Sequence, residues 1–360
     1  MEINSHNKMS IDLTAALTVT RFQSWSPTII SEVFNNSNGS SLPPKQCVRD
    51  TRISQVVFPV LYALVFLLGL LLNGFSIWIF CKVPSHTVFI VYLKNTLAAD
   101  FVMICMLPFK ILTDSGIGSL QMKAFVCRFS SVVFYVSMYI NIILLGLIGL
   151  NRVLKIARPF GKKWVDNVFI ARALSIAAWL LMFGISIPNM VLSNEKATEL
   201  TVKKCASLKS KLGIKWHEAV NHFCQFIFWT TFTLMVIFYT IISKKVYESY
   251  TNSRSRDSST TKKTKAKVFI IVAVFFLCFA PFHFARVPYT ISQTGGIKDC
   301  NVQNKLYIAK ETTLWLAATN VCMDPLIYIL LCKPFRQLLT KGSRSATTSM
   351  EAQTCQDSRM

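Results

Sequence analysis

The sequence predicts an all-α protein, a bundle of seven transmembrane helices followed by a short amphipathic helix. Of the 360 residues, 52% are hydrophobic and only 16% are charged, and the hydrophobic residues are concentrated in long blocks. Soluble chains carry about 25% charged residues. A helix needs roughly 20 mostly apolar residues to cross the hydrocarbon layer of a membrane, and the blocks reach that length. The chain is therefore expected to lie in a membrane.

Each block is expected to be a helix, because a segment in lipid must satisfy its own backbone hydrogen bonds. Internal prolines are expected to bend these helices rather than to end them. The expected spans are residues 56–80, 88–112, 125–152, 169–192, 218–243, 268–292 and 307–332, so that the bundle occupies 56–332.

The segments outside the bundle differ from it in composition. Residues 1–55 are expected to form a mostly disordered N-terminal tail. Residues 333–340 mix basic and apolar side chains, which favours a short amphipathic helix on the membrane surface. The Ser/Thr-rich residues 341–360 are expected to be a disordered cytoplasmic tail that kinases can reach.

The charge of the connecting segments predicts the orientation. The formal net charge is +22, but the basic residues lie between the apolar blocks, which argues against a nucleic-acid-binding protein. The positive-inside rule places the basic segments after spans three and five in the cytoplasm. Asn35 and Asn38 begin N-x-S sequons, which can be glycosylated only on the other side. We expect a multi-pass plasma-membrane protein with an extracellular N-terminus.

Four cysteines outside the apolar blocks fall on the side predicted to be extracellular, namely Cys47, Cys127, Cys205 and Cys300. Four cysteines allow three pairings. Cys127 with Cys205 is one arrangement, and it would leave Cys47 and Cys300 to tie the N-terminal tail to the last outer loop.

Polar side chains at mid-membrane depth form the first candidate site. Asp100 lies mid-span with Asn73 and Asn141 at similar depth, and Asn320 and Asp324 are four residues apart on one helix face. One interpretation is a hydrogen-bonded network that fixes helix packing. The other is a sodium site, because carboxylates with amide oxygens suit a hard cation. The candidate sodium ligands are Asp100, Asn141, Asn320 and Asp324.

A second candidate site lies toward the predicted outer ends of the spans. Arg286 and Lys310 are cations on helices, and Tyr135, two turns inside Cys127, offers an aromatic face. An arginine fork suits phosphate, and a lysine adds a point charge. The combination predicts a ligand with phosphates at one end and a flat ring at the other. The other candidates at this level are His217, Asn221, His283 and Tyr289.

Catalysis and cofactor binding are not expected. His217, His222 and His283 have no cysteine pair or acidic partner at metal-ligand spacing, and no nucleophile–base pair is evident. A transporter would usually show broken helices around a midplane site. We therefore expect neither an enzyme nor a bound cofactor.

The chain resembles the rhodopsin-like G-protein-coupled receptors over residues 47 to about 340. The resemblance rests on the order and spacing of Asn73, Leu97 to Asp100, Arg152, Trp179, Pro281 and Asp324 to Tyr328. Local runs resemble the metabotropic purinergic receptors, in the subgroup that responds to ADP and couples to inhibitory G proteins. These runs are VKKCASLK (202–209), LGIKWH (212–217), CFAPFHFARVPYT (278–290) and KETTLWLAATN (310–320).

The resemblance implies an extracellular adenine nucleotide as ligand and a heterotrimeric inhibitory G protein as partner, with arrestin and receptor kinases as further partners. Tyr135 would stack on the adenine, with Asn189 nearby. Disulfides Cys127–Cys205 and Cys47–Cys300 are implied as well. A nucleotide sugar or an anionic lipid stays open as the ligand of the same fold. The residues implied around the ribose and phosphates are Lys209, His217, Asn221, His283, Arg286, Tyr289 and Lys310.

One departure from the family concerns the inner end of span three. Family members usually place an acidic residue before the arginine of this helix, whereas here Asn151 precedes Arg152. An asparagine lacks the charge that would pair with the arginine, which predicts raised basal signalling. The residues implied in G-protein coupling and switching are Asn151, Arg152, Asp324, Pro325 and Tyr328.

Overall fold

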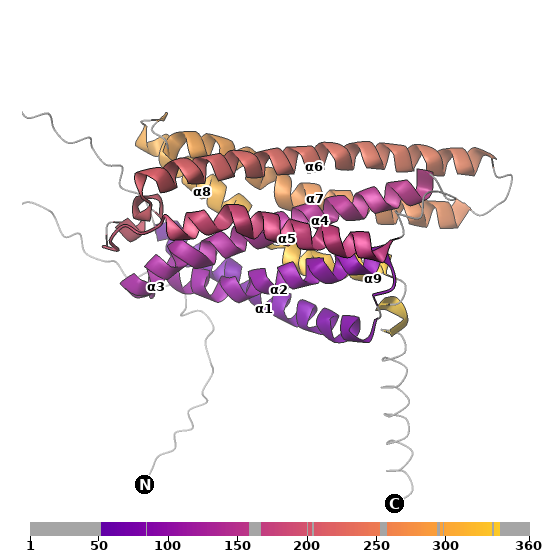
Figure 1. Cartoon of the computed structure of the whole chain (residues 1–360), viewed down its shortest axis with the longest axis horizontal. Helices are drawn as coiled ribbons and strands as arrows, with labels where there is room; N and C mark the ends of the chain where they lie inside the picture. The colour runs from indigo at the N-terminus through magenta and orange to yellow at the C-terminus, as the bar shows by residue number, and fades with distance from the viewer. Residues whose placement is uncertain are drawn as a thin grey trace, which may run out of the picture. The chain divides into compact units, whose positions relative to one another are not determined.

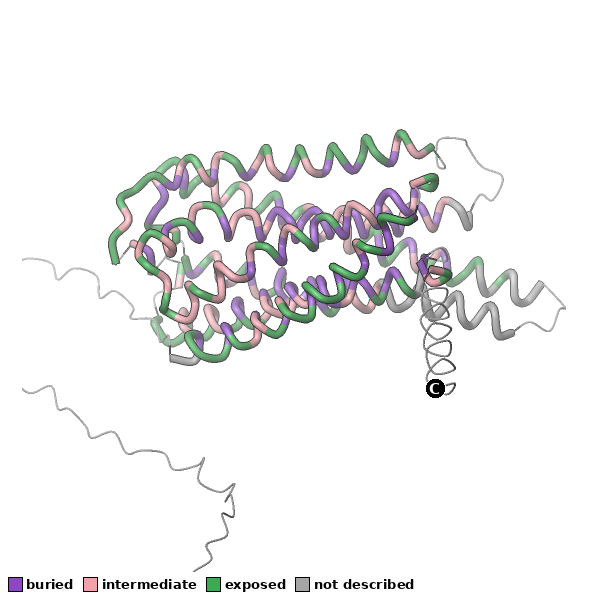
Figure 2. The backbone as a smooth tube through the Cα atoms, turned by 90° about the horizontal axis from the view of Figure 1, so that it is seen from below, coloured by how far each residue is buried: buried purple, intermediate pink, exposed green. Residues whose placement is uncertain are grey.

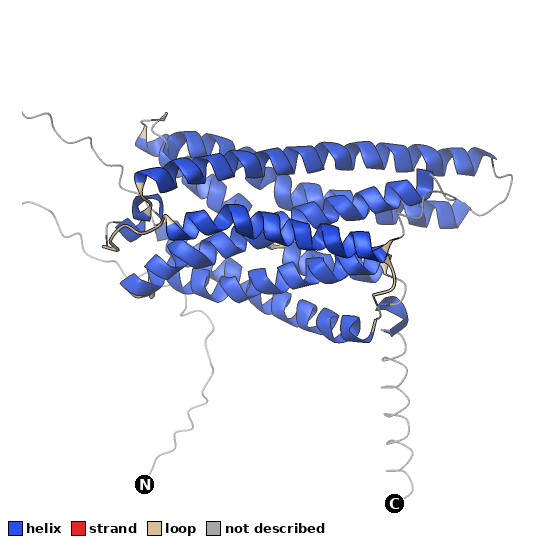
Figure 3. Ribbon diagram, in the orientation of Figure 1, coloured by secondary structure: helices blue, strands red, loops and turns tan. Residues whose placement is uncertain are grey.

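The computed structural model describes residues 52–83, 85–157, 167–199, 201–203, 205–252, 258–293, 296–297, 299–332 and 335–338. These ranges form one bundle of helices and contain no strand (Figures 1 and 3). The elements, in chain order, are α1 (Arg52–Lys82), α2 (Val88–Asp114), α3 (Leu120–Phe125), the π-helical turn η2 (Val126–Ser130), α4 (Ser131–Ala157), α5 (Val168–Val191), the 3₁₀ turns η3 (Thr201–Lys203) and η4 (Cys205–Leu208), α6 (Lys211–Asn252), α7 (Ser258–Gln293), α8 (Cys300–Ala318) and α9 (Asn320–Leu331).

The described helices make seven passes, which confirms the predicted seven-helix bundle. Six of the passes are single stretches long and apolar enough to cross a membrane, with α3, η2 and α4 running together as the third. The seventh pass is divided at Thr319 into α8 and α9. Its first half also carries charge at Lys305, Lys310 and Glu311, so hydropathy alone gives a weaker signal there.

Several helices are longer than the expected spans. α6 begins at Lys211 rather than at 218 and continues to Asn252, and α7 already begins at Ser258. The segment 244–267, expected as a connection, is thus largely helical. Hydropathy marks where a helix crosses lipid, whereas lysine and glutamate are good helix formers that extend it into water. The same holds for α8, which starts at Cys300 behind the N-cap Asp299.

As predicted, the prolines do not end the helices, while the bends expected at them stay a prediction. Pro59, Pro108, Pro188, Pro281 and Pro325 all lie inside helices. At the end of the seventh pass, residues 335–338 form a helical turn, and Phe335 packs on Phe80 with ring centroids 5.2 Å apart. The rest of the predicted segment 333–340 lies outside the described residues.

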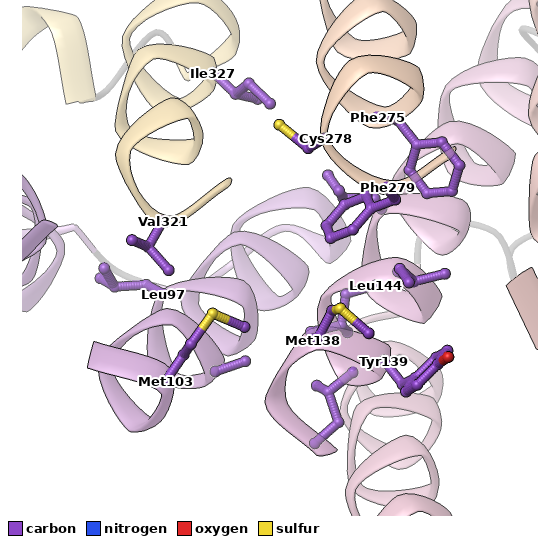
Figure 4. Close-up of a cluster of buried hydrophobic side chains, with 14 of the residues drawn as sticks. Leu97, Met103, Met138, Tyr139, Leu144, Phe275, Cys278, Phe279, Val321 and Ile327 are labelled. Carbon is purple, nitrogen blue, oxygen red and sulfur yellow. The ribbon is translucent and has the colours of Figure 1, made fainter. Parts of the chain in front are cut away.

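Buried residues lie mainly on the inner sides of the helices and exposed residues on their outer sides (Figure 2). Many of the exposed side chains are large and apolar. Figure 4 shows part of this core, where Phe275 and Phe279 of α7 face Met138 and Leu144 of α4. Leu71, with 70% of its surface exposed, is one of many large apolar side chains on the outer face. Such a surface suits a lipid environment and not water.

Close approach of α4 and α6 depends on two glycines. A Cβ added at Gly149 would lie 2.7 Å from Met235 Sδ, and one at Gly146 would lie 2.8 Å from Thr231 Cγ2. Neither distance is compatible with van der Waals packing. Small residues at such crossings let membrane helices pack with their backbones close together.

Candidate functional site

A disulfide marks one end of the bundle, which we call the disulfide end. Cys127 of η2 is bonded to Cys205 at the start of η4, with 5.1 Å between their Cα atoms. Arg128 Nη2 donates to Glu195 O at 2.7 Å, so the connection between α5 and α6 is fixed against the third pass at two points. Cys300 is also disulfide-bonded, whereas Cys47, its predicted partner, lies outside the described residues.

Arg286 is the centre of an aromatic cluster at the disulfide end. Its guanidinium carbon lies 5.6 Å from the ring centroid of Tyr135 and 5.9 Å from that of Tyr289. Its Nη2 donates to Asn221 Oδ1 at 3.0 Å. Tyr135 in turn packs against Phe282, with centroids 6.0 Å apart. The structure therefore brings together four of the predicted site residues from α4, α6 and α7.

Lys310 lies beside this cluster and belongs to an ionic chain that we call the charged quartet, formed by Lys110, Asp114, Lys310 and Glu311. Glu311 Oε1 accepts from Lys310 Nζ, and Glu311 Oε2 accepts from Lys110 Nζ at 3.3 Å. Lys110 Nζ also lies 2.8 Å from Asp114 Oδ2. Between 8% and 26% of each side chain is exposed. Lys310 Nζ is 5.3 Å from the centroid of Tyr289, which joins the quartet to the aromatic cluster.

Three members of the quartet, Lys110, Asp114 and Glu311, were not among the sequence candidates. One signal could have indicated two of them. Lys110 lies inside the expected span 88–112, where charges are rare, and Asp114 follows it four residues later, at the spacing of a helical ion pair. The pairing with Glu311 has no sequence signature, because it joins positions 201 residues apart.

Lys209 is buried with neutral partners. Its Nζ donates to Asn189 O at 3.2 Å, to Asn189 Oδ1 at 3.4 Å and to Ser193 Oγ at 3.1 Å. Only 7% of Lys209 is exposed, and this burial lowers the pKa of its ammonium group to about 8. Asn189, expected near the flat ring of a ligand, thus serves to hold Lys209. His217, half-buried one turn before Asn221, lies within electrostatic reach of both Lys209 and Arg286.

His283 differs from the expectation. It is fully buried, with Nδ1 2.8 Å from Phe279 O and Nε2 3.1 Å from Tyr139 Oη. Its ring also stacks on Phe228 with centroids 3.7 Å apart. Tyr139 lies one helical turn beyond Tyr135, so His283 sits one layer below the aromatic cluster. In this structure both ring nitrogens of His283 have protein partners, which suits a supporting position below the cluster, and the predicted contact of His283 with a ligand stays a prediction.

The mid-membrane polar residues form the predicted hydrogen-bonded network. Asn141 Nδ2 donates to Asp100 Oδ1 at 2.6 Å, and Tyr328 Oη donates to Asp100 Oδ2 at 3.2 Å. Asn320 Nδ2 donates to Asp324 Oδ2 at 3.0 Å. Asn73 Nδ2 donates to Val321 O at 2.7 Å, which ties α1 to α9. The network thus connects α1, α2, α4 and α9.

Some oxygens of this network have no hydrogen-bond partner within the described part of the chain. They are Oδ1 of Asn73, Asn141, Asn320 and Asp324, all of them buried. Amide and carboxylate oxygens are the ligands that a hard cation prefers. The chemistry of this set fits a sodium ion, which would be held by the predicted residues Asp100, Asn141, Asn320 and Asp324.

At the opposite end of the bundle, Arg152 has an aromatic partner. Its guanidinium carbon lies 4.1 Å from the ring centroid of Phe89, in the first turn of α2. Within the described ranges Arg152 makes no ion pair, and the preceding Asn151 is buried. Arg152 therefore makes a cation–π contact with Phe89 where the resemblance leads one to expect an acid–arginine pair.

Comparison with known proteins supports this architecture. The profile of the family described as "7 transmembrane receptor (rhodopsin family)" matches residues 72–328. The chain is 55% identical over 342 residues to purinoceptor 13 of Homo sapiens, an alignment covering 94% of this chain and 97% of that protein. It is 60% identical over 291 residues to purinoceptor 13 of Rattus norvegicus, covering 81% and 86%.

A further relative is purinoceptor 14 of Bos taurus, 46% identical over 306 residues that cover 84% of this chain and 91% of that protein. These matches agree with the runs at 202–209 and 310–320, which most resemble subtype thirteen of the purinergic receptors. Members of this family are receptors rather than enzymes, as the sequence predicted. The chain belongs to the rhodopsin family of seven-transmembrane receptors, and within it to the metabotropic purinoceptors.

Proposed function

We propose that the chain is a cell-surface receptor for an extracellular adenine nucleotide, ADP, and that it lowers cyclic AMP through an inhibitory G protein. The observation that carries this proposal is the position of Arg286 between Tyr135 and Tyr289, with Lys310 over the same Tyr289. A flat aromatic face next to two cations suits a ligand that has a base and a short phosphate chain. The names of the relatives, purinoceptors, agree with a purine ligand.

In this scheme the adenine stacks on Tyr135 and the phosphates reach Arg286 and Lys310. Stacking of a base on an aromatic side chain is worth about 1–3 kcal/mol in single-stranded nucleic-acid complexes. Asn221 orients the guanidinium of Arg286 in advance. Lys209, whose partners are neutral, contributes a positive charge that a phosphate would compensate. His217, within electrostatic reach of Lys209 and Arg286, is assigned to the same ligand.

The orientation belongs to the proposal as well. A disulfide forms in an oxidising compartment, which favours an extracellular disulfide end. Lys244 and Lys245, near the far end of α6, agree with a cytoplasmic opposite end. The N-terminus would then be extracellular, with Asn35 and Asn38, outside the described residues, as glycosylation sites.

Activation would be a population shift, so the ligand must bind the active form more tightly than the inactive form. Phosphates bound by Arg286 and Lys310 draw α7 and α8 together at the disulfide end. α7 bends at Pro281, and its opposite end moves outward to admit a G-protein helix beside Arg152. Asp324, Pro325 and Tyr328 of α9 carry the change to the mid-membrane network. Arrestin and receptor kinases would act on the Ser/Thr-rich tail, outside the described residues.

The test is inhibition of cyclic AMP in cells that express the chain, titrated with ADP, with UDP-glucose and with a lysophospholipid. A response to ADP that Tyr135→Ala weakens about thirtyfold, and that Tyr135→Phe retains, is the expected result. The Tyr135→Ala variant separates a nucleotide from a lipid, because a lipid has no base to stack on Tyr135. A response to the sugar nucleotide or the lipid, with none to ADP, would replace the ligand while keeping the receptor.

A further inference from the structure

We infer that Glu311 is an internal competitor of the phosphate ligand. Its carboxylate neutralises Lys310 and Lys110, and an anionic ligand must take over part of this role in order to bind. The inference rests on the proposed function, because it deepens the assignment of Lys310 to the phosphates. It adds Glu311 and Lys110 as positioning residues that set how much negative charge a ligand needs.

The geometry of Glu311 supports this role. Its two carboxylate oxygens are divided between two lysines, Oε1 on Lys310 and Oε2 on Lys110. Lys110 in turn lies between Glu311 and Asp114, so that the four charges alternate in sign from α2 to α8. Glu311 is almost fully enclosed, and its charge is therefore weakly screened by solvent.

The balance of charge gives the consequence. The charged quartet contains two cations and two anions, so it is neutral as a whole. A phosphate arriving at Lys310 meets an ammonium group whose charge Glu311 already satisfies. Removing the charge of Glu311 leaves the ammonium group of Lys310 without this partner, so a phosphate no longer has to displace a carboxylate. A carboxylate that a ligand must displace from Lys310 favours ligands with enough negative charge to do so, and this specificity comes at a cost in affinity.

Lys110 acts through Glu311 in this arrangement and does not contact the ligand. It draws the carboxylate of Glu311 toward α2 and so leaves Lys310 freer to bind phosphate. Without Lys110, the carboxylate pairs with Lys310 alone, and the affinity for the ligand falls. This effect of Lys110 exists only while Glu311 is charged.

The experiment is a double-mutant cycle on the full chain, read as the ADP concentration for half-maximal inhibition of cyclic AMP. Glu311→Gln is expected to lower that concentration about tenfold, and Lys110→Met to raise it about tenfold. In the Glu311→Gln background, Lys110→Met is expected to change nothing. Additive effects would overturn the inference, because they would mean that Lys110 binds the ligand directly.

Asp114→Asn is the matched control, since it removes the same charge from the same quartet but from an acid whose ion pair in the described structure is with Lys110. We expect less than about a threefold change. An equal gain in ADP potency in Asp114→Asn and in Glu311→Gln would show that Glu311 is not a specific competitor of the ligand.

Where Glu311→Gln fails to reach the cell surface, Glu311→Asp replaces it, because the shorter side chain keeps the charge but reaches the lysines less well. A gain in potency supports the inference, and a loss overturns it.

A second readout separates this inference from the choice of ligand. The midpoint of thermal unfolding of the purified receptor is measured with and without inorganic pyrophosphate. Stabilisation by pyrophosphate that is larger in Glu311→Gln than in wild type supports the competition even if ADP evokes no cyclic AMP response, in which case the proposed function alone fails. Equal or smaller stabilisation in the variant overturns the inference whatever the agonist.

Discussion

The two polar regions inside the bundle differ in the sign of the ionisable groups that make no ion pair within the described residues. The mid-membrane network has two carboxyl groups, Asp100 and Asp324, which contact each other, two amides and a hydroxyl. The disulfide end has Arg286 and Lys209 held by neutral acceptors, besides the neutral quartet. Because an uncompensated buried charge is costly, each region is suited to a ligand of the sign that it lacks. The comparison predicts an anion at one site and a cation at the other.

The largest effect is expected from Arg286→Ala, which removes the central cation of the disulfide end. Loss of one partner of a buried charged contact costs about 2–5 kcal/mol, so the potency of ADP should fall about a hundredfold or more. Cyclic AMP inhibition measures it. Lys215→Ala, at an exposed position of α6, removes the same charge and should leave potency within about twofold. Unchanged ADP potency in Arg286→Ala would mean that the disulfide end does not bind the anionic ligand through Arg286.

The next largest effect is a pH dependence of ADP potency, which follows from the pKa of Lys209. Because burial depresses this pKa to about 8, the receptor loses the lysine's proton as pH rises through about 8, while the unfolded chain keeps it to about 10.4. The receptor's own stability therefore increases in that window, but its attraction for phosphate decreases. ADP potency should fall about tenfold between about pH 7 and about pH 9. In Lys209→Gln, ADP should be less potent at about pH 7, and its potency should depend less on pH. If potency depends on pH as steeply as in wild type, Lys209 does not belong to the ligand site.

At the mid-membrane network, sodium should stabilise the receptor more than potassium does. With sodium at ten times its dissociation constant, the expected gain is about 1.4 kcal/mol in the free energy of unfolding. Asp100→Asn should abolish the difference between the two salts in thermal unfolding. Tyr328→Phe removes a hydrogen bond to Asp100 but keeps both carboxylates, so it should retain the difference. A sodium response that survives Asp100→Asn would leave the network a purely structural feature.

The smallest effect concerns Arg152, which has an aromatic partner in place of an acid. A cation–π contact is worth about 0.5–2 kcal/mol, less than a buried ion pair. Phe89→Leu should therefore raise basal G-protein activation about threefold, while Asn151→Asp should lower it below wild type. Basal nucleotide exchange on the G protein measures both. Equal basal activity in wild type and Asn151→Asp would show that the missing carboxylate is not what sets the resting state.

Hydropathy predicted the passes well because crossing lipid requires a fixed length of apolar sequence, and little else in the chain meets that requirement. It could not predict that α6 continues to Asn252 or that α8 begins at Cys300, because helices leave the membrane without ending. The break at Thr319 also has no signal in hydropathy.

Within the candidate site, the residues whose side chains suit phosphate and a flat ring could be chosen from the sequence, and Tyr135, Asn221, Arg286 and Tyr289 do lie together. The hydrogen bonds of His283 could not be predicted, since a histidine inside a span is equally suited to a ligand or to an enclosed hydrogen-bonded position. Glu311 was missed because its importance depends on Lys110, which only the packing of α2 against the seventh pass brings near.

The interruption at Thr319 has a mechanical consequence. Thr319 N is shared between Trp315 O and Leu316 O, both at 3.2 Å, so the backbone tightens there instead of continuing as a regular helix. The first half of the pass, with Lys310, is tied to the disulfide end, and the second half, with Asp324, is tied to the network. An uninterrupted helix would move at both ends together. Because α8 and α9 meet at Thr319, the pass can bend there, and we expect the stiffness of this turn to set the coupling free energy between the anionic ligand and the sodium ion.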